Sequence, residues 1–487
     1  MKNLIICSIA ALMFCSCASE VQNAKQVNKL PGIFPDYVGV TIPADIAPMD
    51  FSLTADDYDC VDVVVKGSKD GEIHSNGDIV DFDVDEWHKL TEQNKGGKLT
   101  FTVCVKQNGE WTQYKDFTMN VSNYELGEWG LTYRRVAPGY EVYSQMGLYQ
   151  RDLSTFDEYE IIDNNRAPGT CVNCHTSNRT DPQQFLFHAR GEHGATALQK
   201  DGKMEMLNTK TDQTLGLCVY PYWHPDGKYV VFSTNVTRQE YHVVKDERIE
   251  VFDHESDLQV YDTETHELLL SPQVTKPDFN ETFPAFSSDG KTIYFCNTVK
   301  RSYPADTRIV RYNLCSIGFD AQKGVYGDSV KTIIDADADS MSISIPKPSY
   351  DGKYIMYTLA NYGTFPIWHK EADLWLLNLQ TGEKRALNEV NSDDTESYHN
   401  WSANSRWFVF SSRRGDGLYT RLYLSCMDEN GKATKPFLLP QKDPRRYYES
   451  LMYSYNVPDF TKTKVEIDSR TVANQILAPS RTDIKVK

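Results

Sequence analysis

The chain of 487 residues is poor in positive charge, in cysteine and in long apolar runs. Its 68 acidic residues against 51 basic ones give a formal net charge of −17, which argues against binding nucleic acid through bulk electrostatics. Eleven cysteines are too few for a disulfide-stapled fold. Beyond the N-terminus no apolar run could span a bilayer, and no Gly-x-Ser-x-Gly, His-Glu-x-x-His or phosphate-loop motif indicates a hydrolase or kinase.

The N-terminus carries an export signal. Lys2 precedes an apolar run from Leu4 to Phe14, which is too short to cross a membrane, and Ser16-Cys17 follows. This ending resembles a bacterial lipoprotein signal, so residues 1–17 are predicted as the signal peptide and Cys17 as the lipidated residue. An ordinary cleaved signal is the alternative. The protein is therefore expected in the cell envelope, at the periplasmic or outer-membrane surface, held to the membrane only by its lipid.

Residues 18–30 are polar and aperiodic, which is typical of a flexible tether. Residues 31–135 follow with strand patterns: the segment 98–105 alternates apolar and polar side chains and leads to a tight Asn-Gly turn. The sequence predicts a β-sandwich-like domain here. Cys60 and Cys104 form the one disulfide pair that we expect.

The second half of the chain repeats. Segments 220–235, 282–297, 344–360 and 398–414 each combine an aromatic residue or proline, a tight turn and an alternating strand. Three of the turns are Asp-Gly and the fourth is Asn-Ser. With four strands per unit and a period of roughly fifty to sixty residues, the pattern is typical of β-propeller blades.

These segments resemble the TolB-like β-propeller repeat, in which Pro-x-Trp-Ser-Pro-Asp-Gly-Lys precedes a strand. The resemblance implies an all-β fold with a TolB-like propeller over residues 186–470, six-bladed by our choice, followed by a tail over 471–487. An upstream unit near residue 186 would place the preceding segment at the mouth of the first blade.

That segment, within a connector predicted over 136–185, contains "CVNCH". Covalent haem attachment needs this spacing: two thiols add to the porphyrin's vinyl groups, and the adjacent histidine binds the iron. Cys171 and Cys174 are therefore predicted to form the thioethers of one haem c, and His175 to be the axial ligand. Bacteria attach haem outside the inner membrane, where the signal directs the chain.

Three alternatives stay open for the same motif, and one of them is a vestigial motif without a cofactor. A zinc site could combine Cys171, Cys174 and His175 with His188 or His193, although no second cysteine pair follows. A redox dithiol would need a strand-to-helix context that the sequence does not show.

The far side of the iron also needs a ligand if the protein only carries electrons. His188 and His193 follow the motif closely and are the first candidates for the sixth position, and Met204 and Met206 are weaker ones.

The whole arrangement resembles exported proteins of Bacteroidetes-type bacteria that combine a lipoprotein signal, one Cys-x-x-Cys-His motif and a TolB-like propeller. The function expected from it is electron transfer, or a haem redox module that docks a redox or envelope protein partner. A binding scaffold for protein or glycan with a structural metal or haem, and a haem enzyme acting on a small molecule, are the alternatives. No catalytic residue is identified.

Overall fold

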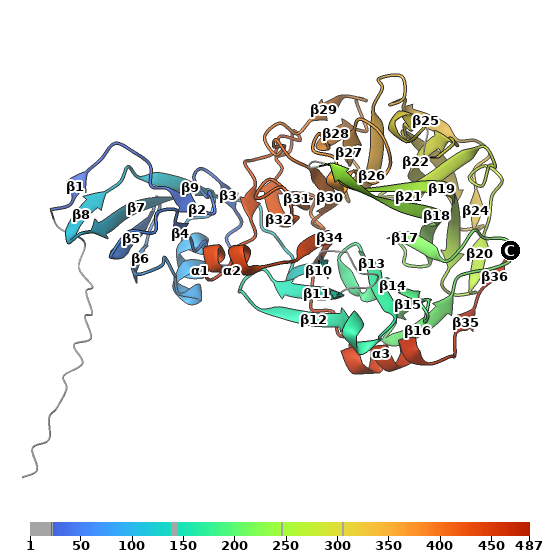
Figure 1. Ribbon diagram of the computed structural model, residues 1–487, viewed down its shortest axis with the longest axis horizontal. Coiled ribbons are helices and arrows are strands. Elements are labelled where there is room, and N and C mark those ends of the chain that lie inside the picture. The colour runs from blue at the N-terminus through green and yellow to red at the C-terminus, as the bar shows by residue number, and fades with distance from the viewer. Residues whose placement is uncertain (1–20, 22, 138–144, 245–246, 304–305) are drawn as a thin grey trace, which may run out of the picture.

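The computed structural model describes residues 21, 23–137, 145–244, 247–303 and 306–487. The fold is all-β, as predicted, and six blades surround a central channel in a β-propeller (Figure 1). A smaller domain packs on the outside of the ring. The signal peptide and Cys17 lie outside the described residues.

The N-terminal domain is built on one mixed sheet in the order β1-β8-β7-β5-β6, in which β9 also pairs with β7 and β3 pairs in parallel with β9. The predicted hairpin is present, since β7 and β8 pair around Asn108-Gly109 with both residues at positive φ. The strands are β1 (Lys25–Gln26), β2 (Ile33–Phe34), β3 (Thr41–Ile42), β4 (Ser52–Leu53), β5 (Cys60–Gly67), β6 (Glu72–Gly77), β7 (Lys98–Gln107), β8 (Glu110–Gln113) and β9 (Phe117–Val121).

Sequence reasoning missed the helix α1 (Val84–Gln93), which covers this sheet. Its signal was present: Asp83 caps the helix by accepting from two backbone N–H groups, and Trp87, Leu90 and Thr91 form the buried face. The expected disulfide is wrong. Cys60 and Cys104 are both free, because β5 and β7 set Cys104 opposite Asp62 and leave the two cysteines diagonal to each other.

Each blade is an antiparallel sheet whose first strand in space lines the channel. Blade 1 is β34 (Ser454–Thr461), β10 (Gly130–Val136), β11 (Met146–Asp152) and β12 (Glu158–Asp163); blade 2 is β13 (Thr170–Asn178), β14 (Asp181–Gly191), β15 (Ala195–Lys200) and β16 (Lys203–Asn208); blade 3 is β17 (Cys218–Trp223), β18 (Tyr229–Val244), β19 (Glu247–Asp262) and β20 (Glu267–Leu269).

The remaining blades come in chain order. Blade 4 is β21 (Phe279–Phe286), β22 (Thr292–Val299), β23 (Asn313–Asp320), β24 (Val325–Tyr326) and β25 (Lys331–Ile334); blade 5 is β26 (Ser342–Pro348), β27 (Tyr354–Ala360), β28 (Asp373–Asn378) and β29 (Lys384–Ala386); blade 6 is β30 (Glu396–Trp401), β31 (Trp407–Ser412), β32 (Arg421–Cys426) and β33 (Phe437–Leu438). Short helices η1 (Asn164–Arg166), η2 (Thr307–Ile309), η3 (Pro366–Trp368) and α2 (Pro444–Ser450) lie in connections.

The ring closes between chain segments far apart in sequence. β34 pairs with β10, so blade 1 takes its inner strand from near the C-terminus and its other strands from residues 130–163. The propeller therefore extends upstream of the predicted boundary at residue 186, which lies inside β14. The predicted connector 136–185 contains blade strands. Blade 1 has no Asp-Gly turn between its first two strands, because β34 and β10 are far apart in the sequence and no turn joins them.

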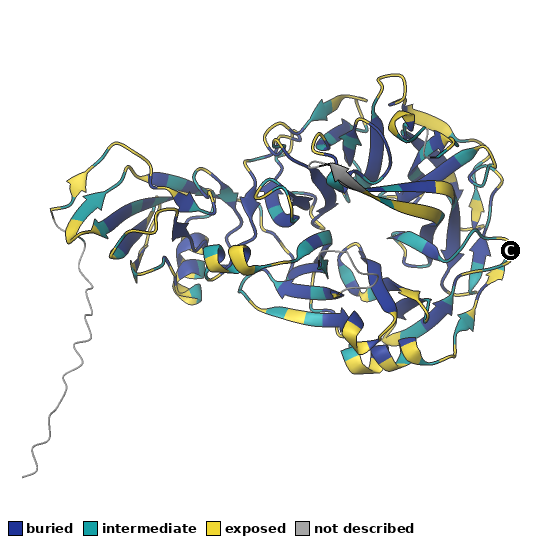
Figure 2. Cartoon of the chain, viewed as in Figure 1, coloured by how far each residue is buried: buried dark blue, intermediate teal, exposed yellow. Residues whose placement is uncertain are grey.

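The C-terminal segment also belongs to the ring. Helix α3 (Ser469–Leu477) packs its buried face into the core of blades 1 and 2, and β35 (Thr482–Asp483) and β36 (Lys485–Val486) pair in parallel with β16 and β20. The segment thus joins the outer edges of blades 2 and 3. The inner strands β13 and β30 are buried along their whole length (Figure 2). Among the described residues, no helix has the length and apolar character needed to cross a bilayer.

Candidate cofactor site in the propeller channel

Every inner strand is interrupted at the same place. In each of them one non-glycine residue has a φ between 42° and 54°, and the register with the neighbouring strand shifts there. Such residues adopt this region rarely, and the shifts are those of a β-bulge. The residue pairs at the six bulges are Cys174-His175, Tyr220-Pro221, Phe283-Pro284, Ile345-Pro346, Tyr398-His399 and Val457-Pro458.

The second half of the Cys-x-x-Cys-His motif is thus also part of the structural repeat. His175 stands where four blades have proline, and His399 in blade 6 is its one match. The motif lies within the buried strand β13 and faces the channel, rather than in a connecting loop. The chemistry of the site therefore depends on how Cys174 and His175 differ from the bulge residues of the other five inner strands.

The two motif cysteines are buried and free. Cys174 lines the channel, and burial raises the pKa of its thiol although the guanidinium of Arg190 acts in the opposite direction. Cys171 lies behind the guanidinium of Arg134, whose NH2 group donates to its Sγ at 3.3 Å. The structure therefore brings both thiols to one strand, beside two cationic side chains.

His175 is 2% exposed, and neither of its ring nitrogens has a hydrogen-bond partner within the described part of the chain. Burial lowers the pKa of its imidazole to about 4, and the backbone of Thr132 acts in the opposite direction. The ring is therefore neutral at physiological pH. A neutral imidazole with a free lone pair is the form that binds iron.

The bulges surround a cavity of about 860 Å³, a figure that includes space open to solvent. Its wall combines aromatic side chains, prolines, two imidazoles and three cations. The lining side chains include Arg134, Cys174, His175, Arg190, Tyr220, Phe283, Lys347, Phe365, Tyr398, His399 and Asp459.

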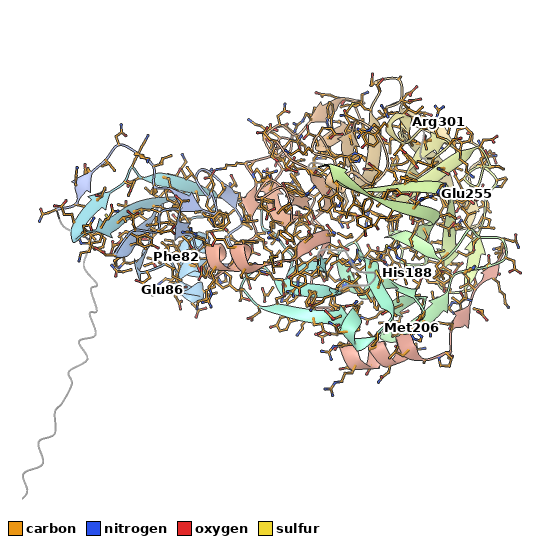
Figure 3. The ribbon with its side chains drawn as sticks, in the orientation of Figure 1. Phe82, Glu86, His188, Met206, Glu255 and Arg301 are labelled. Carbon is orange, nitrogen blue, oxygen red and sulfur yellow. The ribbon has the colours of Figure 1, made fainter. Side chains whose placement is uncertain are left out.

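The structure does not bring His188 together with His175. His188 shares a face of β14 with Leu186, which packs toward blade 3, whereas His175 lies 6.0 Å from the ring of Phe185 on the opposite face. The Nδ1 of His188 lies 3.5 Å from the Thr196 hydroxyl, and burial lowers the pKa of the His188 imidazole to about 3. Figure 3 labels His188 on β14.

The other predicted sixth ligands lie outside the cavity wall. His193 is in the turn between β14 and β15, and its carbonyl accepts from Arg481. Met204 and Met206 are on β16, three ladder positions from β13 and so roughly 14 Å from it. Met206 belongs to the core beside α3 (Figure 3).

Sequence reasoning missed four channel residues: Arg134, Lys347, His399 and Asp459. Aligning the repeats on the two bulge residues, such as Tyr220-Pro221, would have found three of these four residues. His399 takes the position of His175, and Lys347 and Asp459 each follow the bulge by one residue. Arg134 carried no local signal, because β10 enters the ring only through its pairing with β34.

The described residues contain no cluster of three or more histidine, cysteine, aspartate or glutamate side chains that could hold a metal ion. This counts against the zinc alternative, which needs about four such ligands. It does not bear on a haem, whose iron is held mainly by the porphyrin and takes one or two protein ligands.

No family model matches the chain, and no curated protein does. Similar solved structures include the periplasmic gluconolactonase of Pseudomonas aeruginosa, at 11% identity over 83% of this chain and 99% of that chain, with a TM-score of 0.38. Prolyl oligopeptidase B from Galerina marginata bound to a 25mer macrocyclization substrate has 12% identity, coverages of 79% and 53%, and a TM-score of 0.37.

An oligogalacturonate lyase in complex with manganese has 12% identity, coverages of 63% and 73%, and a TM-score of 0.36. Similarities this weak transfer no activity to the chain. The pairing of the strands within the six blades shows the propeller fold.

Proposed function

We propose that this protein is a c-type haem protein of the cell envelope, with the haem carried by Cys171 and Cys174 and its iron bound by His175. The observation that supports this most is His175: a buried imidazole on the cavity wall, without a hydrogen-bond partner among the described residues. A buried polar group without a partner is costly. Iron binding would satisfy one of its nitrogens.

Other features of the site suit such a group. Both thiols are free and lie on the same strand as the imidazole, at the sequence spacing that thioether attachment requires. Cys174 lines the cavity, whereas Cys171 lies beside Arg134 and outside the cavity wall. When bound, the haem supplies an iron that gains and loses one electron. Tyr220, Phe283 and Tyr398 would lie against an apolar macrocycle and exclude water.

We assign the protein to electron transfer, as a redox module that docks a redox or envelope protein partner. The cavity offers a place for a one-electron centre, and among the described residues that line it the Cys174 thiol is not hydrogen-bonded to the His175 imidazole. The surface of a propeller ring is well suited to docking because its loops project from a rigid frame.

The envelope location rests on the signal residues of the sequence. Changing Cys17 to Ala should move the protein from the membrane fraction to the soluble periplasmic fraction, because the lipid would be its only anchor. Immunoblots of fractionated cells would measure this. A Cys17→Ala protein that still sediments with membranes would overturn the lipoprotein assignment.

The haem proposal is tested by expressing the protein with and without haem-maturation machinery and measuring the pyridine haemochrome. We expect one covalent haem per chain with the machinery and none without it. The Cys171→Ala/Cys174→Ala double variant should stay colourless. The matched control is Cys315→Ala, which removes a buried free thiol from blade 4 and should leave the haem in place. Haem that acid acetone extracts from the wild type would overturn the proposal.

One observation favours a second candidate, a haem enzyme acting on a small molecule: none of His188, His193, Met204 and Met206 lines the cavity. An iron with an open sixth position binds added ligands. Carbon monoxide titration of the reduced protein separates the two candidates. Rapid binding favours the enzyme, and refusal favours the carrier.

A further inference from the structure

The channel cavity carries more positive than negative charge. Arg134, Arg190 and Lys347 line it, and the carboxylate on its wall is that of Asp459. That carboxylate is already engaged: Oδ2 accepts from the Ser177 N–H at 2.9 Å and Oδ1 accepts from the Asn400 side-chain amide at 2.7 Å. An excess of cations inside a protein of net charge −17 needs a physical reason.

Lys347 is the clearest case. It is partly buried on β26, directly after the bulge, and its Nζ lies 4.9 Å from the ring centroid of Tyr222. Within the described residues, no carboxylate oxygen lies within 4 Å of this ammonium group. Burial lowers its pKa, which the attraction of Asp459 only partly opposes. A cation is costly to bury without a close anion.

Arg134 shows the same deficit. Its guanidinium donates to two sulfur atoms, Met146 Sδ at 3.1 Å and Cys171 Sγ at 3.3 Å, and its Nε is buried without a partner in the part of the chain that is described. Sulfur is a weak acceptor, whereas a planar guanidinium matches a carboxylate. Both cations thus face the cavity with bonding capacity to spare.

Aromatic rings share the wall with these cations: Tyr220, Phe283, Phe365 and Tyr398. We infer that the cavity binds an organic carboxylate, with Lys347 and Arg134 holding the charged groups and the aromatic side chains covering a flat apolar body. The carboxylates could belong to a porphyrin or to a smaller free aromatic acid. The inference rests on Lys347 and Arg134 and stands without covalent haem.

The test uses full-length protein made without haem maturation, so that the cavity is free of covalent haem. Fluorescence titration compares protoporphyrin IX with its dimethyl ester, and 2-naphthoate with 2-naphthylmethanol; each pair differs mainly in charge. We expect the acid of at least one pair to bind at least tenfold more tightly than its neutral partner. Lys347→Met and Arg134→Met should each reduce that preference, and Lys347→Arg should retain it.

Lys353→Met is the matched control, because it removes an exposed-turn lysine from the same blade and should leave the preference unchanged. Thermal unfolding checks that each variant folds, and Arg134→Met serves if Lys347→Met does not. A preference for protoporphyrin alone identifies the porphyrin as the source, and a preference for naphthoate alone identifies a smaller acid. Equal binding of acid and neutral partner in both pairs, or a preference that both Met variants retain, would overturn the inference. Neither result changes the haemochrome assay, so the two proposals fail separately.

Discussion

Blades 2 and 6 differ in how they treat the same histidine. His175 and His399 occupy equivalent bulge positions, and each is buried toward the second strand of the preceding blade. In blade 6 one ring nitrogen is paired, since Nε2 lies 2.9 Å from the Met356 carbonyl oxygen, and Nδ1 has no partner within the described residues. In blade 2 the imidazole lies near the equivalent residue, Thr132, but neither nitrogen has a hydrogen-bond partner within the described residues.

The difference separates structure from chemistry. Four prolines and two histidines at one position show that the bulge accepts either residue. Nothing about the fold therefore requires His175. Thr395 and Tyr398 stand where blade 2 has its two cysteines, so blade 2 differs from blade 6 in carrying two thiols. It also differs in that neither nitrogen of its imidazole has a hydrogen-bond partner among the described residues. This is the pattern expected of a position taken over for ligand binding.

The largest expected effect comes from replacing each histidine by the residue that the repeat favours. His175→Pro should remove the imidazole ligand from the iron completely, and His399→Pro should leave iron coordination unchanged. The bulge accommodates proline in four blades, so both variants should fold. Electron paramagnetic resonance and the visible spectrum of the oxidised protein, both taken after haem maturation, would measure the ligand change.

An unchanged spectrum in His175→Pro would contradict the assignment of the iron ligand. A change in His399→Pro alone would move that role to blade 6. Equal changes in both would indicate that the imidazoles act through the fold rather than through the iron.

Sequence reasoning predicted the propeller because its signal is repeated and local. The Asp-Gly turns at Gly227, Gly290 and Gly352 require positive φ, which glycine adopts without strain. It placed the first blade incorrectly because β10 to β12 carry no turn signal of their own and are completed by β34. Ring closure is a long-range pairing that local patterns do not encode.

The candidate site was predictable only in part. The spacing of Cys171, Cys174 and His175 is local, so the sequence pointed to it. The choice of His188 and His193 assumed that closeness in sequence means closeness to the iron. Alternation along β14 puts His188 on the other face of the sheet, whereas residues more than 150 positions away, such as Lys347, share the cavity.

Asp459 offers the second test, since it joins the two blades by accepting from Ser177 of blade 2 and Asn400 of blade 6. Burial raises the pKa of this carboxyl to about 6. A folded-state pKa above the unfolded value means that the folded protein holds the proton more tightly. This contribution to stability is therefore present at low pH and is lost as the pH rises from about 4 to about 6.

Asp459→Asn should flatten that decline in the unfolding free energy by up to about 3 kcal/mol, the equivalent of two pKa units. Urea denaturation of protein made without haem, at several pH values between 4 and 7, would measure it. Asp212→Asn is the control, because that aspartate is exposed in the turn between β16 and β17. Parallel pH profiles in wild type and Asp459→Asn would show that the bridge between the blades does not titrate in this range.

The smallest expected effect is on the stability of the protein without haem. Here His399→Pro should have the larger effect, whereas in the first prediction His175→Pro has it. His399→Pro removes the hydrogen bond to the Met356 carbonyl and leaves that buried acceptor without it, so the free energy of unfolding should fall by about 1 kcal/mol. His175→Pro removes no such bond, and the proline also restricts the unfolded chain, so its stability should be equal to or slightly above that of the wild type. Thermal unfolding of the two variants side by side measures the difference. If His175→Pro lost the more stability, His175 would be a structural residue of the bulge, and the case for blade 2 as the ligand-binding blade would rest on its thiols alone.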